Sequence, residues 1–344
     1  MKQPLVEGSA TALVEQCDAV LFDLDGVLYV GASAVEGARD AVAAVTAAGV
    51  AIAFVTNNAS RTPATVAEHL RSLGIPARPE DVVTSAQATA TVLAGTVSPG
   101  SRVLVVGGDG LWEALREKGL VPVSSWAEDP AAVAQGFAPA VGWRMLAEGT
   151  AAVRDGLPWV ASNLDLTIPT DLGISPGNGT LVQVIASASG RRPVVAGKPE
   201  TPLYLESAQR VSSRHPLVVG DRLDTDIEGA NRAGVPSLLV LTGVTTVDDL
   251  LRAPPEHRPT YLAEGLDAGL LQPYSPVLRH GPSVWGCDGW LCHEVDGRLQ
   301  LTGEGPRASG VRALCVATWE SGLGPTDVDD RALRALRDAT TRRR

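Results

Sequence analysis

Short apolar runs that end in polar residues constrain the fold of this chain more than any other feature. The runs AVLFD (19–23) and VAIAFVTNN (50–58) show no alternation of polar and apolar side chains, and the helix-like stretch GARDAVAAVTAAG (37–49) separates them. Strands that are apolar on both faces favour a parallel sheet covered by helices. The pattern returns later in the chain, in PVVAGKP (193–199), PLVVGDR (216–222) and PSLLVLTG (236–243). The sequence therefore predicts an α/β fold with a doubly wound parallel sheet.

A second α/β stretch lies between these two blocks. Within it, RVLVVGG (102–108) and AVAQGF (132–137) are typical of strands, and helix-like segments follow each of them. Near the end of the chain, VWGCDGWLCHEV and GRLQLTG indicate a short hairpin, and a helix is expected near 308–321. The predicted division is a discontinuous core of residues 1–84 and 190–265, an inserted α/β domain of residues 85–189, and a small α+β extension of residues 266–344.

Charge and composition argue against several classes of function. The 344 residues include 29 Lys and Arg against 39 Asp and Glu, which gives a net charge of −10. Such an acidic balance argues against nucleic acid and against an anionic membrane as partners. Four cysteines in a chain of this length do not build a disulfide scaffold. The first residues contain no apolar run typical of a signal peptide. We therefore expect a cytoplasmic protein. The sequence leaves open whether it forms a homodimer.

Four separate segments carry residues suited to chemistry. They are DLDGVLY (23–29) with Asp23 and Asp25, the triplet Thr56-Asn57-Asn58, Lys198 in AGKP, and GDRLDTD (220–226) with Asp221, Asp224 and Asp226. Taken singly, each has an ordinary explanation as a turn, a helix cap or a solvated lysine. Taken together, they all follow predicted parallel strands, whose carboxyl ends are where ligands bind in open α/β sheets. Several carboxylates at one place require a cation, and hard oxygen ligands favour Mg²⁺.

The four segments, in this order, resemble the motifs of the haloacid dehalogenase superfamily of aspartate-nucleophile phosphatases across about residues 20–243. The interval between Asp23 and Thr56 is too short for a cap domain, whereas the interval between Thr56 and Lys198 is long enough for one. The insertion therefore resembles the C2-type cap of the NagD-like branch. Within that branch, VTSAQ (83–87) and PGNG (176–179) are most similar to the glycerol-3-phosphate phosphatases of actinobacteria.

The resemblance implies a role for each motif residue. Asp23 attacks phosphorus to give an aspartyl-phosphate, and Asp25 is the general acid and then the general base. Thr56 and Lys198 bind the phosphoryl oxygens, and Asn57 and Asn58 line the site. The implied Mg²⁺ ligands are Asp23, the carbonyl oxygen of Asp25, and Asp221. Asp226 is a supporting acidic residue, and Asp224 is expected to orient the loop.

Substrate specificity is expected to reside in the cap. Its candidate contact loop is NLDLTIP (163–169), in which Asn163 and Asp165 are expected to hold the loop in place. Ile168 occupies the position at which pyridoxal phosphatase and phosphoglycolate phosphatase relatives carry a histidine, which argues against both substrates. The resemblance thus implies a Mg²⁺-dependent phosphomonoester hydrolase that acts on a small phosphorylated metabolite, with glycerol 3-phosphate as the first candidate.

Several alternatives stay open at this point. A nitrophenylphosphatase of broad specificity, a phosphoglycolate or nucleotide phosphatase, a phosphomutase and a non-catalytic phosphate sensor could carry similar motifs. The extension resembles a degenerate piece of an acetyltransferase fold and is interpreted as structural or interfacial. Cys287, Cys292 and His293 raise the question of zinc, but they lack a CxxC pair and a second nearby histidine, so we interpret the cysteines as buried or incidental thiols.

Overall fold

The computed structural model describes residues 3–170 and 172–337. The chain divides into two compact units, one made of Met1–Ile52 with Ser213–Arg344 and the other of Ala53–Ser212. Within the described residues, no helix is long and apolar enough to cross a membrane.

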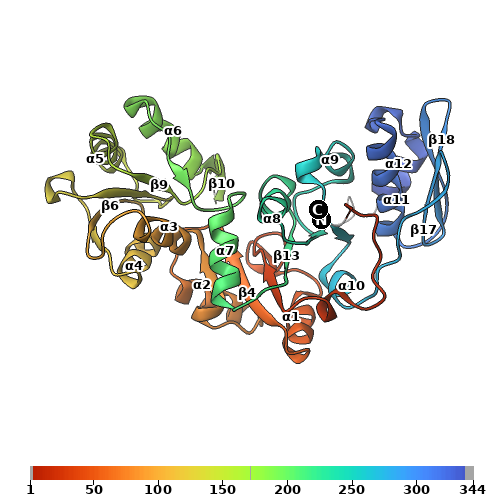
Figure 1. Cartoon of the computed structure of the whole chain (residues 1–344), viewed down its shortest axis with the longest axis horizontal. Helices are drawn as coiled ribbons and strands as arrows, with labels where there is room; N and C mark the ends of the chain where they lie inside the picture. Colours follow the sequence, from red (N-terminus) through yellow and green to blue (C-terminus); the bar gives the residue numbers. More distant parts are fainter. Residues whose placement is uncertain (1–2, 171, 338–344) are drawn as a thin grey trace. The chain divides into compact units, whose positions relative to one another are not determined.

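A parallel sheet forms the centre of the first unit (Figure 1). Every residue is buried in its strands β1 (Ala19–Phe22), β13 (Pro216–Gly220), β14 (Ser237–Val240) and β15 (Tyr261–Ala263). The strand order is β15-β14-β13-β1-β4-β5, in which β4 (Ala51–Thr56) carries the chain from one unit into the other. The predicted apolar runs thus form a parallel α/β sheet because their side chains are buried on both faces.

Short helices and turns connect these strands. The flap after β1 holds β2 (Tyr29–Val30) and β3 (Ser33–Ala34), and α1 (Ala38–Ala47) follows it. A π-type turn over Leu223–Ile227 leads directly into α8 (Glu228–Ala233). The remaining elements here are the short turns Leu13–Glu15 and Pro255–His257, α9 (Val247–Leu251) and α10 (Leu266–Leu270).

The C-terminal extension is larger than the short hairpin that the sequence predicted. It is a four-stranded antiparallel sheet, with α11 (Arg307–Ser321) packed on it (Figure 1). Its strands are β16 (Leu278–Gly281), β17 (Val284–Cys287), β18 (Trp290–Val295) and β19 (Arg298–Gly303), and the turn Pro325–Asp327 and α12 (Asp330–Arg337) follow α11. The sequence missed β16 because this edge strand is largely exposed and carries no apolar pattern.

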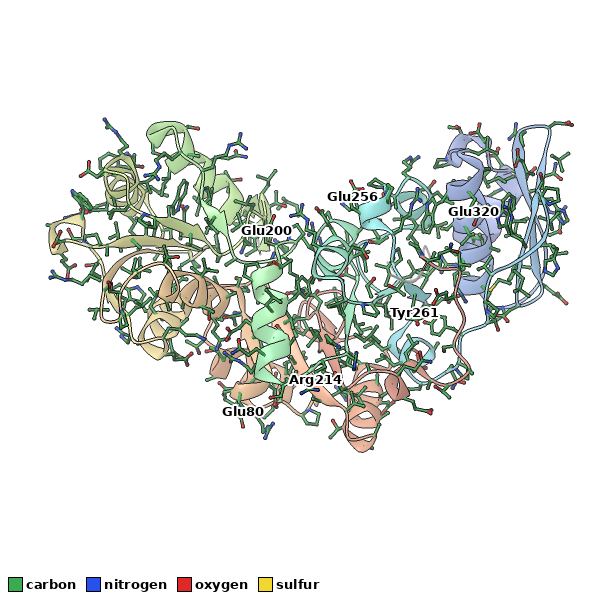
Figure 2. All side chains as sticks on the ribbon, in the orientation of Figure 1. Glu80, Glu200, Arg214, Glu256, Tyr261 and Glu320 are labelled. Carbon is green, nitrogen blue, oxygen red and sulfur yellow. The ribbon has the colours of Figure 1, made fainter. Side chains whose placement is uncertain are left out.

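Apolar packing joins the extension to the rest of the first unit. One continuous core cluster contains Leu5, Leu239 and Leu250 together with Trp285 and Leu314. Trp285 also donates a hydrogen bond of 2.8 Å from its Nε1 to a carboxylate oxygen of Glu320 on α11, which is labelled in Figure 2. The extension therefore shares its core with the sheet of the first unit.

The second unit contains its own five-stranded parallel sheet in the order β12-β9-β8-β6-β7. The strands are β6 (Arg102–Val106), β7 (Val121–Val123), β8 (Ala132–Gln135), β9 (Trp159–Ala161) and β12 (Val194–Val195), and the antiparallel hairpin of β10 (Thr167–Thr170) and β11 (Gly173–Pro176) projects after β9. The helices are α2 (Pro63–Ser72), α3 (Ser85–Ala94), α4 (Asp109–Glu117), α5 (Trp143–Arg154), α6 (Asn178–Ser189) and α7 (Thr201–Arg210). Short turns lie at Pro79–Asp81 and Trp126–Glu128, and β5 (Val82–Thr84) pairs with β4.

The sequence predicted that residues 193–199 belong to the core sheet, and this prediction is wrong for the strand β12. It pairs with β9 instead, Val194 opposite Val160 and Val195 opposite Ala161. The segment that follows β12 packs closely against the segment that follows β9. A Cβ on Gly197 would lie 2.2 Å from the carbonyl oxygen of Ser162. Only glycine allows the two backbones to approach this closely.

A buried carboxylate fastens α7 to α3 and α4. Glu206 is 7% exposed and accepts hydrogen bonds from Thr91 Oγ1 at 2.8 Å and from the Arg210 guanidinium at 2.9 Å. Lys118 Nζ lies 3.4 Å from the same carboxylate. Burial raises the pKa of Glu206, but the hydrogen bonds and the two cations outweigh it and hold the pKa below its usual value of 4.5.

Replacing this carboxylate by an amide tests its contribution to stability. We expect Glu206→Gln to lower the free energy of unfolding by about 2 kcal/mol at neutral pH, since hydrogen bonds to a buried charged group contribute on this scale. A depressed folded pKa stabilises the protein above the unfolded value, and this contribution is lost as the pH falls through the folded pKa. The difference from wild type, measured by urea unfolding, should therefore shrink below pH 4.5. Glu117→Gln, at an exposed position of α4, is the matched control and should change little at either pH.

Candidate active site

Three carboxylates of the first unit lie close together at the carboxyl ends of two neighbouring strands. Asp23 follows β1 and Asp221 follows β13. The backbone N–H of Asp23 donates to the Val219 carbonyl oxygen at 2.8 Å and so extends the parallel pairing of the two strands. One carboxylate oxygen from each of Asp23, Asp221 and Asp226 lies within 4.8 Å of the others. Asp221 is fully buried and Asp226 is 1% exposed. The adjacency that the sequence pattern predicted for Asp23 and Asp221 is therefore present, and Asp226 belongs to the same group.

This cluster fits a divalent cation. Three carboxylates at this separation repel one another when ionised, and burial of two of them strengthens the repulsion. An oxygen-only donor set is the kind that Mg²⁺ and Ca²⁺ prefer. Among the described residues, the Asp23, Asp221 and Asp226 carboxylates lie close enough together to hold a metal ion.

The loop after β14 holds Asp221 in place. Val244 donates its backbone N–H to Asp221 Oδ2 at 2.7 Å, and Thr245 Oγ1 donates to the Asp221 carbonyl oxygen at 2.6 Å. Gly243 approaches so closely that a Cβ there would lie 1.9 Å from Asp221 Oδ2. None of these residues was predicted from the sequence, although Gly243 ends the apolar run 236–243 and a glycine at such a place is a signal for close backbone approach.

A second glycine packs against Asp221 from the first motif. Gly26 has a φ of +85°, and a Cβ there would lie 2.4 Å from Asp221 Oδ2. Thr242 Oγ1 donates to the Gly26 carbonyl oxygen at 2.7 Å, so the loop after β14 also contacts the loop after β1. The glycine of DLDG thus allows the first motif to turn directly against the buried carboxylate.

Asp25 and Asp224 differ from the three clustered carboxylates in exposure. Asp25 is exposed, and Tyr29 Oη lies 3.5 Å from its Oδ2. Asp224 is exposed and forms an ion pair of 2.8 Å with Arg222. Desolvation raises the pKa of Asp224, but the hydrogen bond and the charge of Arg222 outweigh this effect. The pKa therefore lies below its usual value, and the carboxylate stays ionised. These contacts fit the prediction that Asp224 orients its loop.

In the second unit, Thr56 and Asn58 form a compact turn at the end of β4. Thr56 is 5% exposed, and its Oγ1 accepts the backbone N–H of Asn58 at 3.0 Å. The side-chain oxygen of Asn58 accepts from both the backbone N–H and the Oγ of Ser60, each at 2.8 Å. The side chain of Asn58 thus closes the turn, while the Thr56 hydroxyl keeps a proton that it can donate.

The side chain of Asn57 pairs with the backbone of Lys198 as a neighbouring strand would. Its Oδ1 accepts the Lys198 N–H at 2.8 Å, and its Nδ2 donates to the Lys198 carbonyl oxygen at 3.2 Å. Lys198 is 3% exposed. Thr56-Asn57-Asn58 and Lys198, which are far apart in the sequence, are therefore brought together within this unit.

The candidate cap loop lies beside this pair. Asn57 Nδ2 also donates to Asp165 Oδ2 at 3.1 Å, and Asn163 Nδ2 donates to the Asn57 carbonyl oxygen at 2.7 Å. Ile168 lies on the hairpin strand β10 opposite Ser175 and is partly exposed. The roles predicted for Asn163 and Asp165 in holding the loop agree with these hydrogen bonds.

The cysteines of the extension do not form a metal site with His293. Cys292 and His293 are neighbours on β18, opposite Trp285 and Val284 respectively, and successive residues of a strand point to opposite faces. Burial raises the pKa of Cys292 to about 12, which keeps the thiol protonated.

The close approach of Gly243 to Asp221 can be tested by adding one methyl group. We expect Gly243→Ala to weaken Mg²⁺ binding about tenfold, which corresponds to about 1.4 kcal/mol, because the new Cβ must displace the Asp221 carboxylate. Isothermal titration calorimetry with Mg²⁺ measures this, and circular dichroism checks the fold. Gly281→Ala, where a Cβ meets nothing within 4 Å, is the control. An unchanged dissociation constant in a folded Gly243→Ala protein would show that Asp221 does not hold the ion.

Family models match three parts of this chain. The haloacid dehalogenase-like hydrolase model matches residues 20–121, and a related HAD-hydrolase-like model matches residues 195–268. A third model, the GCN5-related N-acetyltransferase like domain, matches residues 287–339.

Known proteins resemble the chain over most of its length. A D-glycerol 3-phosphate phosphatase of Mycobacterium tuberculosis is 42% identical over 94% of this chain and 91% of its own. The glycerol phosphate phosphatase structure from the same organism in complex with magnesium has a TM-score of 0.85, with 41% identity over 97% of this chain and 98% of that one. NagD from Escherichia coli matches 72% of this chain and 96% of its own, with a TM-score of 0.67 and 29% identity.

An acid sugar phosphatase of Staphylococcus aureus is 36% identical over 75% of this chain and 99% of its own. The resemblance inferred from the motifs is thus confirmed by matches that extend far beyond them. This chain belongs to the haloacid dehalogenase-like hydrolase family.

Proposed function

We propose that this protein is a Mg²⁺-dependent phosphatase that hydrolyses D-glycerol 3-phosphate through an aspartyl-phosphate. The observation that carries the proposal is the group of Asp23, Asp221 and Asp226 at the ends of β1 and β13. Support for the substrate comes from the M. tuberculosis relative, which is named a D-glycerol 3-phosphate phosphatase and matches nearly the whole chain, including the extension.

The proposed reaction proceeds in two displacements. In the first, a carboxylate oxygen of Asp23 bonds to phosphorus, the bond from phosphorus to the ester oxygen breaks, and Asp25 donates a proton to the leaving alkoxide. In the second, Asp25 takes a proton from water, the water oxygen bonds to phosphorus, and the bond to Asp23 breaks. Inorganic phosphate is released, and both carboxylates return to their starting state.

The remaining side chains support these two steps. Asp23 and Asp221 would hold the cation together with the Asp25 carbonyl oxygen, and Asp226 would add negative charge beside it. When bound, Mg²⁺ neutralises charge on the phosphate and on the carboxylates. The Thr56 hydroxyl and the Lys198 ammonium are proposed to bind phosphoryl oxygens. The division into a core, a C2-type cap and an extension, the cytoplasmic location and a homodimer stay predictions.

A phosphatase of broad specificity is the second candidate, because the acid sugar phosphatase of S. aureus and a p-nitrophenyl phosphatase of Archaeoglobus fulgidus are also similar to this chain. The ratio of kcat/KM between D-glycerol 3-phosphate and p-nitrophenyl phosphate separates the two candidates. A clear preference for the glycerol ester supports the first, and equal values support the second.

Asp23→Asn tests the nucleophile. The amide keeps the size of the side chain but cannot attack phosphorus as the carboxylate does, so phosphate release from D-glycerol 3-phosphate should fall by several orders of magnitude. Wild-type activity should also disappear with EDTA and return with Mg²⁺, because the carboxylates and the phosphate dianion require a cation. Activity of the variant close to that of wild type would contradict the aspartyl-phosphate mechanism.

Ile168→His tests the contribution of the β10–β11 hairpin to specificity. Since relatives that act on pyridoxal phosphate or phosphoglycolate are expected to carry a histidine here, kcat/KM for these substrates relative to D-glycerol 3-phosphate should rise about fivefold. The rate with p-nitrophenyl phosphate should change less, because its leaving group requires little help. Ile174→His on the other hairpin strand, where the side chain is 76% exposed, is the matched control. If the order of the substrates by kcat/KM is the same in Ile168→His as in wild type, this hairpin position does not determine specificity.

A further inference from the structure

The base of the β10–β11 hairpin is hydrogen-bonded on both sides of the hairpin. On the side that enters β10, Asn163 Oδ1 accepts the backbone N–H of Asp165 at 3.1 Å. On the side that leaves β11, Asn178 Nδ2 donates to the Asn163 carbonyl oxygen at 2.8 Å. The Gly179 N–H donates to the Asp165 carbonyl oxygen at 2.9 Å. Asn163 is 5% exposed and Asn178 is 1% exposed, so these bonds are shielded from water.

The same loop contacts Asn57 at two points. Asn163 Nδ2 reaches the Asn57 carbonyl oxygen at 2.7 Å, and Asp165 Oδ2 accepts from Asn57 Nδ2 at 3.1 Å. Ser85 Oγ, at the start of α3, donates to the same Asn57 carbonyl oxygen at 2.6 Å. Backbone and side chain of Asn57 are thus both fixed by neighbours.

Asn57 in turn determines where the backbone of Lys198 lies. Its side-chain amide accepts from the Lys198 N–H and donates to the Lys198 carbonyl oxygen. Asn57 Oδ1 must face the Lys198 N–H in order to accept from it, and Asn57 Nδ2 must face the hairpin loop in order to donate to Asp165. The carboxylate of Asp165 therefore selects the amide orientation that fits the Lys198 backbone, because a carboxylate can only accept from Nδ2.

We propose that Asp165 is a positioning residue that acts through the Asn57 amide on Lys198, so that the base of the β10–β11 hairpin and the phosphate-binding lysine are held as one unit. This inference rests on the proposed function in assigning phosphate binding to Lys198. It gives the cap loop a part in catalysis that is separate from contact with the leaving group. A loop displaced at its base would move the lysine, and a misplacement of about 1 Å can cost about 100-fold in rate.

Exchanging the carboxylate and the amide tests the proposal. In Asn57→Asp, the new carboxylate still accepts the Lys198 N–H but faces the Lys198 carbonyl oxygen and the Asp165 carboxylate without a proton to donate. We expect kcat/KM for D-glycerol 3-phosphate to fall about 100-fold and the inhibition constant of inorganic phosphate to rise, while the Mg²⁺ dissociation constant stays unchanged. Asp165→Asn should cost less than about fivefold, because the new amide oxygen still accepts from Asn57.

The double variant Asn57→Asp/Asp165→Asn separates positioning from general damage. The exchanged pair can form the same hydrogen bond in reverse, so its kcat/KM should exceed that of Asn57→Asp about tenfold, a coupling that only interacting residues show. Equal kcat/KM values for the double variant and Asn57→Asp, or wild-type kcat/KM in Asn57→Asp, would overturn the proposal.

An activity-independent readout distinguishes this failure from failure of the proposed function. Amide hydrogen exchange of the peptide that contains Lys198 should accelerate in Asn57→Asp and recover in the double variant. If wild type releases no phosphate but this exchange pattern holds, the proposed function fails and the positioning of Lys198 stands. If wild type is active and the exchange is the same in all variants, the positioning inference fails and the proposed function stands.

Discussion

Repulsion between carboxylates at the ends of β1 and β13 is the constraint on which the first unit depends. Parallel pairing places the residues after both strands side by side, and both are aspartates. Burial of Asp221 and Asp226 makes this arrangement unfavourable without compensation. Part of the compensation comes from the backbone N–H of Val244 and part from the cation that the oxygen cluster fits. Stability and function are thus linked, because the same ion that neutralises the cluster would neutralise the phosphate.

The sequence predicted those parts of the site that follow apolar strands. Asp23, Thr56 and Asp221 could be placed because a buried strand has a clear pattern and its carboxyl end has a known direction. The contacts of Gly243 with Asp221 and of Asn57 with Lys198 could not be placed, since they depend on how loops fold back in three dimensions. The spacing of apolar residues in the sequence does not indicate the direction in which a loop turns. The strand β12 was assigned to the wrong sheet for a similar reason, because two apolar residues carry no information about their partner.

The second unit uses side-chain amides where a strand would use its backbone. Asn57 offers one donor and one acceptor to Lys198, in the way that an extended backbone does, and Asn163 extends this pairing to the hairpin loop. A side-chain amide can bridge segments that do not run parallel, which a regular ladder cannot do. Because these groups are largely buried, losing one partner leaves a buried polar atom unsatisfied, which costs more than the bond itself contributes. Such a network specifies one arrangement of the loop that carries Lys198.

The extension contributes to the first unit through the helix that follows the Asp221 loop. Residues 243–245 contact Asp221, and α9 begins only two residues later, at Val247. Val247 and Leu250 belong to the same buried cluster as Leu314 of α11, and Trp319 Nε1 donates to the Leu250 carbonyl oxygen at 3.2 Å. The residues that hold the buried carboxylate therefore rest on a helix whose other side packs against the extension. This continuity gives the acetyltransferase-like segment a structural reason to be joined to a phosphatase-like core, because its packing reaches the loop that orients Asp221.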